Sequence, residues 1–483
     1  MQEINFSRIS FIGSLVLFSL YLINSIFYLD EINFLAHSIG FSLLGLFFFI
    51  IYKSPHALFS PITWFILASS IYYGFGSLFY SFGGYEGLNY IDTWYYVDQS
   101  ALQKVNTLNV IAISLTLLFF SIMMKIKIFS SKSSITSETN LLDLADKFAF
   151  IGLSITLFGR FLASTQGSEY NLPGIINNLT VFAHAALFIY AMLFFKKVPG
   201  SKIRFWILMP ILGVLSLASL MKQEILQFLM AIILANLFVK ANFMYILKIG
   251  LVSVILLPIL VIFTSFGRSL LWSNLDLDDI SLATTVQEAS ILVNDLSLLA
   301  DEVANRNEIQ NEVAGQNSAI ASAINFVWMR FVQAPAQAAA IQFRLDGDHG
   351  DSFELLKWAF VPRLLYPDKP IITPGVDYQI RLTGTDIGGS AAPGYWADGY
   401  WNYGWFGVVF VSLVLAAFFA WFTQFNIQAL TTGSLFLFPL MFLGIKMGYR
   451  VEDWFASGTI NSIPFMIIIY YVCKLCNAKW YFK

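Results

Sequence analysis

The chain has 483 residues, of which 57% are hydrophobic and only 12% are charged. A soluble domain carries roughly 25% charged residues, so this composition excludes an ordinary soluble protein and indicates a membrane protein. The net charge of −2 gives no reason to expect a nucleic-acid partner. The first apolar stretch is long and lacks a small-residue cleavage site, so we expect no cleavable signal peptide.

Apolar stretches recur along most of the chain. A helix needs about 20 apolar residues to cross a bilayer. Twelve stretches meet this requirement, and they predict an all-α polytopic membrane protein with about 12 transmembrane helices. The predicted spans lie near residues 9–29, 32–52, 60–82, 106–124, 148–165, 175–195, 203–221, 223–240, 243–265, 404–424, 433–449 and 459–476.

The distribution of basic residues predicts the orientation, because cytoplasmic loops carry an excess of Lys and Arg. With the N-terminus in the cytoplasm, 15 of the 28 basic residues fall on the inner side. These are Arg8, Lys53, Lys125, Lys127, Lys132, Lys147, Lys196, Lys197, Lys202, Arg204, Lys240, Lys248, Lys474, Lys479 and Lys483. We therefore predict that both termini are cytoplasmic.

In this orientation, residues 267–403 form one large extracytoplasmic loop between spans 9 and 10. The loop separates helices 1–9 (1–266) from helices 10–12 (404–483). Apolar residues at helical spacing predict helices over 286–303 and 320–341, and Pro335 is expected to kink the second. We interpret the loop as a lid of helices followed by a Pro- and Gly-rich segment, 358–407, that carries the site.

Several cations fall at the outer ends of predicted spans, where charge near lipid tends to face a cavity or a partner. They are Arg160, Lys222, Arg268, Lys446 and Arg450. A ring of such cations would suit a lipid-linked phosphate or pyrophosphate. Alternatively, each side chain reaches the interface or pairs with a nearby carboxylate, for which Glu224 and Glu452 are candidates.

Further cations lie within the predicted loop and could extend this anion clamp. They are Arg330, Arg344, Arg363, Lys369 and Arg381. Arg363 and Lys369 could equally hold the Pro-rich turn in place through Asp368 or loop carbonyls.

Asp398 lies six residues before Gly404, where span 10 is predicted to begin. A carboxylate held there could take a proton from a sugar hydroxyl. The neighbouring Tyr400 and Trp401 could stack on sugar rings, or they could belong to the aromatic belt at the membrane interface.

Other polar patterns give weaker predictions. The sequence D-G-D-H-G-D at 346–351 lacks the full spacing of a calcium loop, so no metal site is predicted, although His349 remains an alternative base. His184 is interpreted as a satisfied polar residue within span 6. Cys473 and Cys476 lack a second ligand pair. No nucleotide-binding glycine loop is present, so a sugar donor would be lipid-borne.

The order of these motifs resembles a known family. Arg330 is followed by V-P-R-L-L-Y-P-D-K-P (361–370), Gly375 and D-G-Y-W-N-Y-G-W-F-G (398–407). This pattern resembles bacterial O-antigen polymerases, the Wzy-type oligosaccharide repeat-unit polymerases, many of which have Glu where this chain has Asp398. The motifs cover about the last third of the predicted loop, and the twelve-span layout agrees with the family.

The resemblance implies a GT-C-like glycosyltransferase in the bacterial inner membrane, with its active site on the periplasmic side. It would transfer a growing glycan from undecaprenyl pyrophosphate to another lipid-linked repeat unit, without a cofactor or metal, and a chain-length regulator is a possible partner. Asp398, Arg363 and Arg268 would be catalytic. The residues expected to bind pyrophosphate or glycan are Arg160, Lys222, Arg330, Lys369, Arg381, Arg450, Tyr400 and Trp401.

Three alternatives stay open. An O-antigen ligase would share the scaffold and the donor, and His349 is the only loop histidine it could use. A lipid-linked oligosaccharide flippase would be expected to show repeated halves and broken helices. A structural partner of an export machine would not need such a concentration of external charge at the helix ends.

Overall fold

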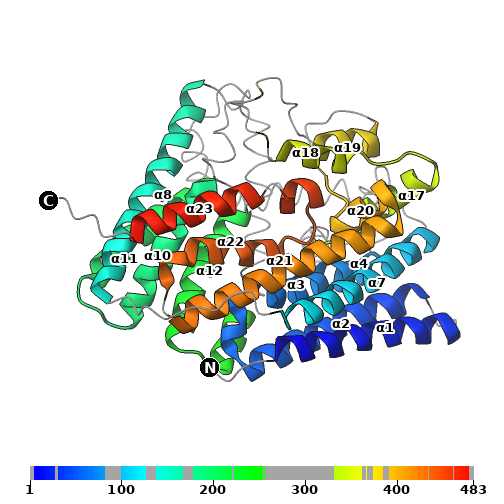
Figure 1. The fold of residues 1–483 in the computed structure, drawn as a ribbon, viewed down its shortest axis with the longest axis horizontal. Helices are drawn as coiled ribbons and strands as arrows, with labels where there is room; N and C mark the ends of the chain where they lie inside the picture. The colour runs from blue at the N-terminus through cyan, green and yellow to red at the C-terminus, as the bar shows by residue number, and fades with distance from the viewer. Residues whose placement is uncertain are drawn as a thin grey trace, which may run out of the picture. The chain divides into compact units, whose positions relative to one another are not determined.

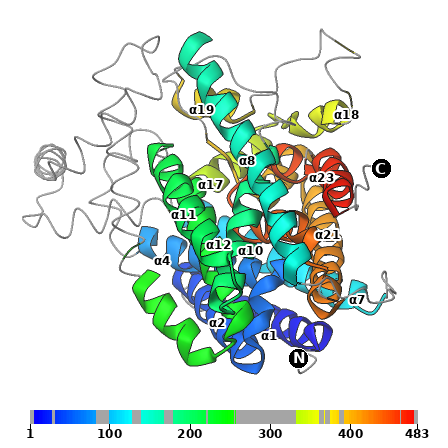
Figure 2. The same ribbon diagram turned by 90° about the vertical axis from the view of Figure 1, so that its left-hand side faces the viewer.

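A computed structural model of the chain describes residues 5–27, 31–81, 99–126, 138–166, 178–219, 222–253, 256, 331–359, 361, 366, 374–384, 391–432, 434–460 and 462–477 (Figures 1 and 2). These residues are predominantly helical and contain no strand, so the predicted all-α class is confirmed for them. The chain divides into two compact units. Unit 1 comprises 1–130, 310–427 and 444–466, and unit 2 comprises 131–309, 428–443 and 467–483.

The N-terminal part of unit 1 is a bundle of long apolar helices. Its elements are α1 (Phe6–Phe27), α2 (Glu31–Lys53), η1 (Pro55–Phe59), α3 (Pro61–Ser69), the π-helical turn η2 (Ser70–Phe75), α4 (Gly76–Ser81) and α7 (Gln99–Met123). Helix α1 packs along α7, where the Ser14 hydroxyl donates to the Ser114 carbonyl at 2.8 Å. The buried hydroxyls of Thr63 and Ser70 likewise donate to backbone carbonyls, of Ala57 at 2.8 Å and of Gly40 at 2.7 Å, which satisfies them within the bundle.

The rest of unit 1 consists mainly of short elements. They are α17 (Ala334–Leu345), η5 (Ser352–Leu355), α18 (Leu356–Ala359), α19 (Pro374–Thr383), α20 (Tyr395–Tyr403) and the π-helical turn η7 (Phe455–Ile460). Helices α17 and α20 pack against each other and against α7. The described part of the predicted loop is therefore largely helical, and its helices α17 and α20 pack onto α7, an apolar helix of the N-terminal bundle.

Unit 2 is built around α10 (Val181–Phe195). Every side chain from Val181 to Leu193 is buried, because α8 (Glu138–Gln166), α11 (Ser201–Ala218) and α12 (Lys222–Val239) surround the helix. The short helix η3 (Asn178–Thr180) leads into α10. Gly152 of α8 lies so close to the backbone of Ala183 that a larger residue would not fit.

Three C-terminal helices contribute residues to both units. They are α21 (Trp405–Thr432), α22 (Phe438–Tyr449), which follows η6 (Leu435–Leu437), and α23 (Ser462–Asn477). Within unit 2, the Phe188 and Phe438 rings stack with their centroids 3.6 Å apart. Within unit 1, Gly448 lies directly against the backbone of Pro61, so the helices approach closely where side chains are absent.

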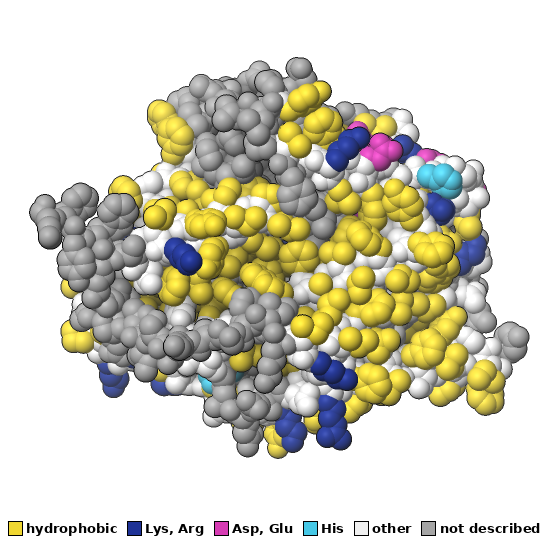
Figure 3. Space-filling view, in the orientation of Figure 1, with side chains coloured by type: hydrophobic (Ala, Val, Ile, Leu, Met, Phe, Trp, Pro, Cys, Tyr) yellow, Lys and Arg dark blue, Asp and Glu magenta, His cyan; other side chains and the backbone are white. Residues whose placement is uncertain are grey.

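Among the described residues, four helices are long and apolar enough to cross a membrane: Phe6–Phe27, Phe34–Lys53, Ser100–Met123 and Trp405–Thr432. Shorter apolar helices are Val181–Phe195, Gln223–Val239, Phe243–Ser253, Leu435–Tyr449 and Ser462–Asn477. Figure 3 shows hydrophobic side chains over much of the surface in view, as expected for a chain that contacts lipid. Each of the twelve predicted stretches contains helix, but twelve spans and the division into 1–266, 267–403 and 404–483 stay predictions.

One expectation for the loop is wrong. Pro335 does not kink a helix, because residues 331–333 are not helical and α17 begins at Ala334 with Pro335 in its first turn. A proline is tolerated there, since the first N–H groups of a helix have no partner within it. Residues 286–303 and 320–330 lie outside the described residues.

Candidate functional site

The site segment 398–407 forms the end of α20, a sharp corner and the start of α21. Gly404 makes the corner with φ of 61°, a conformation that favours glycine, and its N–H donates to the Tyr400 carbonyl at 2.7 Å. Beyond the corner, Gly407 lies directly against the backbone of Gly399, and a Cβ on Gly407 would overlap the Gly399 carbonyl. The two helices can cross this closely only because both positions are glycine.

Asp398 is the first residue of this segment and is completely buried. Its Oδ1 accepts hydrogen bonds from the Ser352 hydroxyl at 2.5 Å and from the Asn402 amide at 3.0 Å. Its Oδ2 accepts a hydrogen bond from the Phe455 backbone N–H at 3.1 Å. The carboxylate thus connects α20 to η5 and η7, two elements that are distant from it in sequence.

Asn402 completes the polar network from the next turn of α20. Its amide nitrogen also donates to the Ser352 hydroxyl at 2.8 Å, and its oxygen accepts from the Phe353 N–H at 3.2 Å. Because residues 398 and 402 are four apart, their side chains lie on the same face of the helix. The spacing of four residues therefore lets Asp398 and Asn402 bond to each other and to Ser352.

Burial raises the pKa of Asp398 from 3.8 to about 7, while the hydrogen bonds from Ser352, Phe455 and Asn402 oppose this rise. Near neutral pH the carboxyl group therefore exists in both protonation states. The group lies before the apolar helix that begins at Trp405, outside the candidate membrane spans.

A rim of charged side chains lies beside this buried network. Arg344, at the end of α17, donates from one nitrogen to the Trp401 carbonyl at 3.0 Å and to the Asn402 carbonyl at 2.6 Å. These carbonyls belong to the last turn of α20, where a cation also interacts favourably with the helix dipole. The same nitrogen of Arg344 lies 3.2 Å from Nδ1 of His349, which is exposed.

Arg381 forms the second half of the rim. It pairs with Asp348 at 2.6 Å, and its guanidinium carbon lies 5.3 Å from the centre of the Trp401 ring. The Trp401 indole donates in turn to the Asp348 carbonyl at 2.9 Å. We call Arg344, Asp348, His349 and Arg381 the polar rim.

An aromatic core supports the rim from below. Trp401 is only 2% exposed, and its ring packs against Phe343, Tyr378 and Trp454. The predicted sugar-stacking residue Trp401 therefore lies beneath Arg381. Tyr400 is half-buried and contacts the edge of Trp405. The exposed aromatic residues that follow are Tyr403, Trp405 and Phe406.

One predicted outer-end cation, Arg450, and one candidate carboxylate partner, Glu224, have described neighbours. Arg450 pairs with Asp453 at 2.7 Å, two residues before the Phe455 that binds Asp398. This agrees with the alternative in which such a cation pairs with a nearby carboxylate, although the partner is Asp453 and not Glu452. In unit 2, Oε2 of Glu224 lies 4.0 Å from Nε2 of the buried His184.

Much of the predicted anion clamp lies outside the part of the chain that the structure describes. Arg268, Arg330, Arg363 and Lys369 lie outside the described residues. Arg160 and Lys222 belong to α8 and α12, but their side chains are outside the description. Among the described residues, no group of three His, Cys, Asp or Glu side chains could hold a metal ion. In the 346–351 cluster, Asp348 is engaged by Arg381.

Two partners of Asp398 could not be predicted from the amino-acid sequence. Ser352 lies 46 residues before it and Phe455 lies 57 residues after it, and neither belongs to a recognisable spacing with the motif. Only Asn402, four residues after Asp398, could be predicted as its neighbour from the spacing in the sequence. The chain matches no protein-family model, no curated protein and no solved structure.

Proposed function

We propose that this chain is a membrane glycosyltransferase that polymerises undecaprenyl-pyrophosphate-linked oligosaccharide repeat units into O-antigen or a related polysaccharide on the periplasmic face. One observation carries the proposal. The segment with the family-like motif, 398–407, builds a fully buried network of Asp398, Asn402 and Ser352 directly before an apolar helix long enough to cross a membrane. Burying polar groups costs free energy unless they are hydrogen-bonded, and a hydrogen-bonded buried network fixes one local arrangement.

The reaction would join two lipid-linked glycans. The acceptor hydroxyl oxygen attacks the anomeric carbon of the donor, the bond from that carbon to the pyrophosphate oxygen breaks, and the hydroxyl proton passes to a base. Negative charge develops on the leaving pyrophosphate, which cations stabilise. Arg344 and Arg381 of the polar rim are the described cations beside the motif, and the predicted clamp residues Arg160, Lys222, Arg268, Arg330 and Arg363 would add to them.

For Asp398 we favour a positioning role. Its carboxylate is fully buried and both of its oxygens accept hydrogen bonds, so it holds η5, α20 and η7 together beneath the rim. A base that accepts the acceptor proton must reach the substrate. Asp398 would therefore affect catalysis through the arrangement of the rim.

The test is a glycan ladder gel from cells that lack this chain and are rescued with wild type, Asp398→Asn or the matched control Asp377→Asn. Asp377 is an exposed carboxylate in the first turn of α19. We expect cells without the chain to attach a single repeat unit to the lipid core. Wild type and Asp377→Asn should restore the ladder, whereas Asp398→Asn at normal abundance should shorten or abolish it. An unchanged ladder in cells without the chain would contradict the proposal and favour a transporter or partner role.

A second candidate function is an O-antigen ligase, and the exposed His349 beside Arg344 favours it. An exposed histidine next to a cation is suited to proton transfer at a glycan hydroxyl. The same gel separates the two candidates. Loss of a ligase would remove every repeat unit from the lipid core while long polymer accumulated on the lipid carrier, and His349→Ala would reproduce that pattern.

A further inference from the structure

A buried amide pair joins α17 to α7 in unit 1. The Asn109 side-chain nitrogen donates to the Gln337 side-chain oxygen at 2.9 Å, and the Gln337 nitrogen donates back to the Asn109 oxygen at 2.8 Å. Asn109 is 0% exposed and Gln337 is 1% exposed. Burying an amide costs free energy unless it is hydrogen-bonded, and here each amide offsets the cost of burying the other.

The pair lies on a helix long and apolar enough to cross a membrane. Asn109 belongs to the candidate span Ser100–Met123, and in such helices polar side chains hydrogen-bond across to their neighbours. Asn106, three residues earlier and on the same face of α7, accepts a hydrogen bond from the Ser77 hydroxyl of α4 at 2.6 Å. This face of α7 therefore offers one polar partner to α4 and another to α17.

The buried face of α17 is made mostly of small residues. Gln337 is its only buried residue with a polar side chain, and the other buried residues are Ala334, Pro335, Ala338, Ala340 and Ile341. Alanine side chains are alike, so their packing distinguishes poorly between two positions of α17 one helical turn apart. The amide pair does distinguish them, because a shifted helix would leave two buried amides unpaired.

The other hydrogen bonds that join the described part of α17 to another helix involve backbone carbonyls. The Tyr378 hydroxyl of α19 donates to the Ala336 carbonyl at 2.5 Å, and Arg344 donates to carbonyls of α20. Because every residue of a helix has a carbonyl group, such bonds select one position less sharply than a pair of side chains does. The Asn109–Gln337 pair is therefore the contact that best defines the register of α17.

This register decides where Arg344 lies. Arg344 follows Gln337 by seven residues, or two helical turns, and it donates to the Trp401 and Asn402 carbonyls at 3.0 and 2.6 Å. A shift of α17 by one turn would move the arginine by about 5.4 Å along the helix axis, which is beyond hydrogen-bonding distance of both carbonyls. The amide pair thus acts on the polar rim from two turns away.

We propose that Asn109 and Gln337 are positioning residues, which fix the register of α17 on α7 and thereby hold Arg344 of the polar rim against the end of α20. The expected effect on polymer yield rests on the proposed function. The expected effect on the register of α17 does not depend on any activity, so the two can fail separately.

The variants Asn109→Leu, Gln337→Met and their combination separate positioning from stability. Each single substitution leaves one buried amide without its partner and should lower the melting temperature by a few °C. The double variant replaces both amides by apolar groups of similar shape, so it should recover most of this loss. The glycan ladder should not recover with it. At normal abundance, we expect the double variant to give about a tenth of the wild-type polymer or less, because a displaced binding group lowers the rate.

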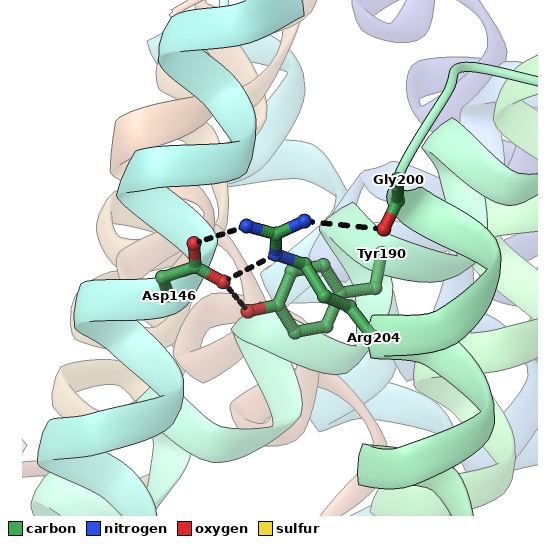
Figure 4. A network of polar contacts seen from close by, with 4 residues as sticks. All are labelled: Asp146, Tyr190, Gly200 and Arg204. Atoms are coloured by element: carbon green, nitrogen blue, oxygen red, sulfur yellow. Dashed lines mark hydrogen bonds and ion pairs between the residues drawn. The ribbon is translucent and has the colours of Figure 1, made fainter.

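Tyr190→Phe is the matched control, because it removes a hydrogen bond between helices of unit 2. The Tyr190 hydroxyl of α10 donates to Asp146 of α8. The Arg204 guanidinium of α11 donates to both oxygens of Asp146, at 2.8 and 3.0 Å, and to the Gly200 carbonyl at 3.2 Å (Figure 4). None of these residues belongs to the polar rim. The control should therefore lower the melting temperature and leave the ladder at its wild-type length.

Distances between two spin labels measure the register directly, in a chain whose two cysteines are replaced by alanine. Labels attached at Gln342→Cys on α17 and at Ile122→Cys on α7 occupy exposed positions. With the amide pair intact, double electron–electron resonance should give one narrow distance distribution. In the Asn109→Leu/Gln337→Met variant, the distribution should broaden or shift by up to about 5 Å, the length of one turn.

Three results would overturn the inference. They are an unchanged distance distribution in the double variant, a ladder that recovers together with the melting temperature, and an equal loss of polymer in Tyr190→Phe. A changed distribution, together with an unchanged ladder in cells that lack the chain, would instead support the positioning of α17 and contradict the proposed function.

Discussion

At the scale of single residues, two opposing effects act on the Asp398 carboxyl group. It is completely buried, which disfavours a charge, yet it accepts hydrogen bonds from Ser352, Asn402 and the Phe455 backbone, which favour one. Burial has the larger effect, so the pKa rises to about 7. The contribution of Asp398 to the free energy of unfolding therefore depends on pH up to the neutral range.

The first prediction concerns stability and pH. The Asp398 carboxyl has a pKa near 3.8 when unfolded and about 7 when folded, so the folded chain binds more protons between these values. Its stabilising contribution is therefore complete below pH 3.8 and is lost as the pH rises to about 7. A shift of about 3 pKa units corresponds to ~4 kcal/mol at most. The asparagine side chain in Asp398→Asn stays neutral at every pH, so this variant should not lose stability in this way as the pH rises.

Thermal unfolding in detergent at pH 5, 6.5 and 8 measures the effect. The melting temperature of Asp398→Asn, relative to wild type, should rise by a few °C between pH 5 and pH 8, on the order of what ~1–4 kcal/mol produces. The exposed Asp377→Asn variant should show no such trend. A relative melting temperature for Asp398→Asn that is the same at all three pH values would exclude a raised pKa.

A second prediction at this scale concerns Arg344. It donates to two carbonyls of the last turn of α20, and the shorter, neutral side chain of glutamine can replace only part of this arrangement. Arg344→Gln should therefore lower polymer yield and destabilise the chain by about 1–2 kcal/mol, since hydrogen bonds to charged groups are worth about 1.5–3 kcal/mol. Arg344→Lys keeps the positive charge on a shorter side chain and should be intermediate. Glycan ladders and melting temperatures of the two variants check this order.

At the scale of elements, contacts between glycines set how closely α20 and α21 cross. Gly407 has no room for a side chain against Gly399, and Gly404, with φ of 61°, forms the corner between the two helices. This crossing places the Asp398 network at the start of a membrane-length helix.

The third prediction tests the crossing. Gly407→Ala would overlap the Gly399 carbonyl and should destabilise the chain by about 1–3 kcal/mol or more, the usual cost of overpacking. Gly45→Ala is the matched control, because a Cβ at Gly45 of α2 would meet nothing within 4 Å. Alanine there should be neutral or stabilising by up to about 1 kcal/mol. Melting temperatures of the two purified variants give the comparison, and equal values would contradict a tight α20–α21 contact.

The fourth prediction concerns the link between α8, α10 and α11 in unit 2. Arg204 holds Asp146 through two hydrogen bonds, while its own side chain is 40% exposed. Arg204→Lys should cost about 1 kcal/mol, because lysine cannot reproduce the planar fork. Arg8→Lys, at an exposed position of α1, should change the melting temperature by less than the error of the measurement. A loss for both variants alike would indicate a general effect of replacing arginine.

At the scale of the whole molecule, the fifth prediction concerns the membrane topology, that is, the side of the membrane on which each loop lies. Reporter fusions inserted in the turn at 197–199 should be cytoplasmic, and fusions inserted at 346–347 should be periplasmic, because the basic residues gather on the predicted inner side. Alkaline phosphatase is active only outside the cytoplasm. Green fluorescent protein fluoresces only in the cytoplasm, because it does not fold correctly after export in the unfolded state. A pair of fusions that report the same side would exclude an odd number of spans between the two positions.

The helical class and the positions of the apolar helices could be predicted from the amino-acid sequence, because a helix in lipid needs a long run of apolar residues and such runs are visible in the residue order. The step of four residues from Asp398 to Asn402, within the predicted site segment 358–407, could also be read as one face of a helix. The other partners of Asp398 could not be predicted, because Ser352 and Phe455 reach it through chain folding that no local pattern encodes. The same holds for Trp401, whose burial beneath Arg381 depends on α17, α19 and α20 meeting in space, and for Pro335, whose place in a first turn depends on where α17 begins.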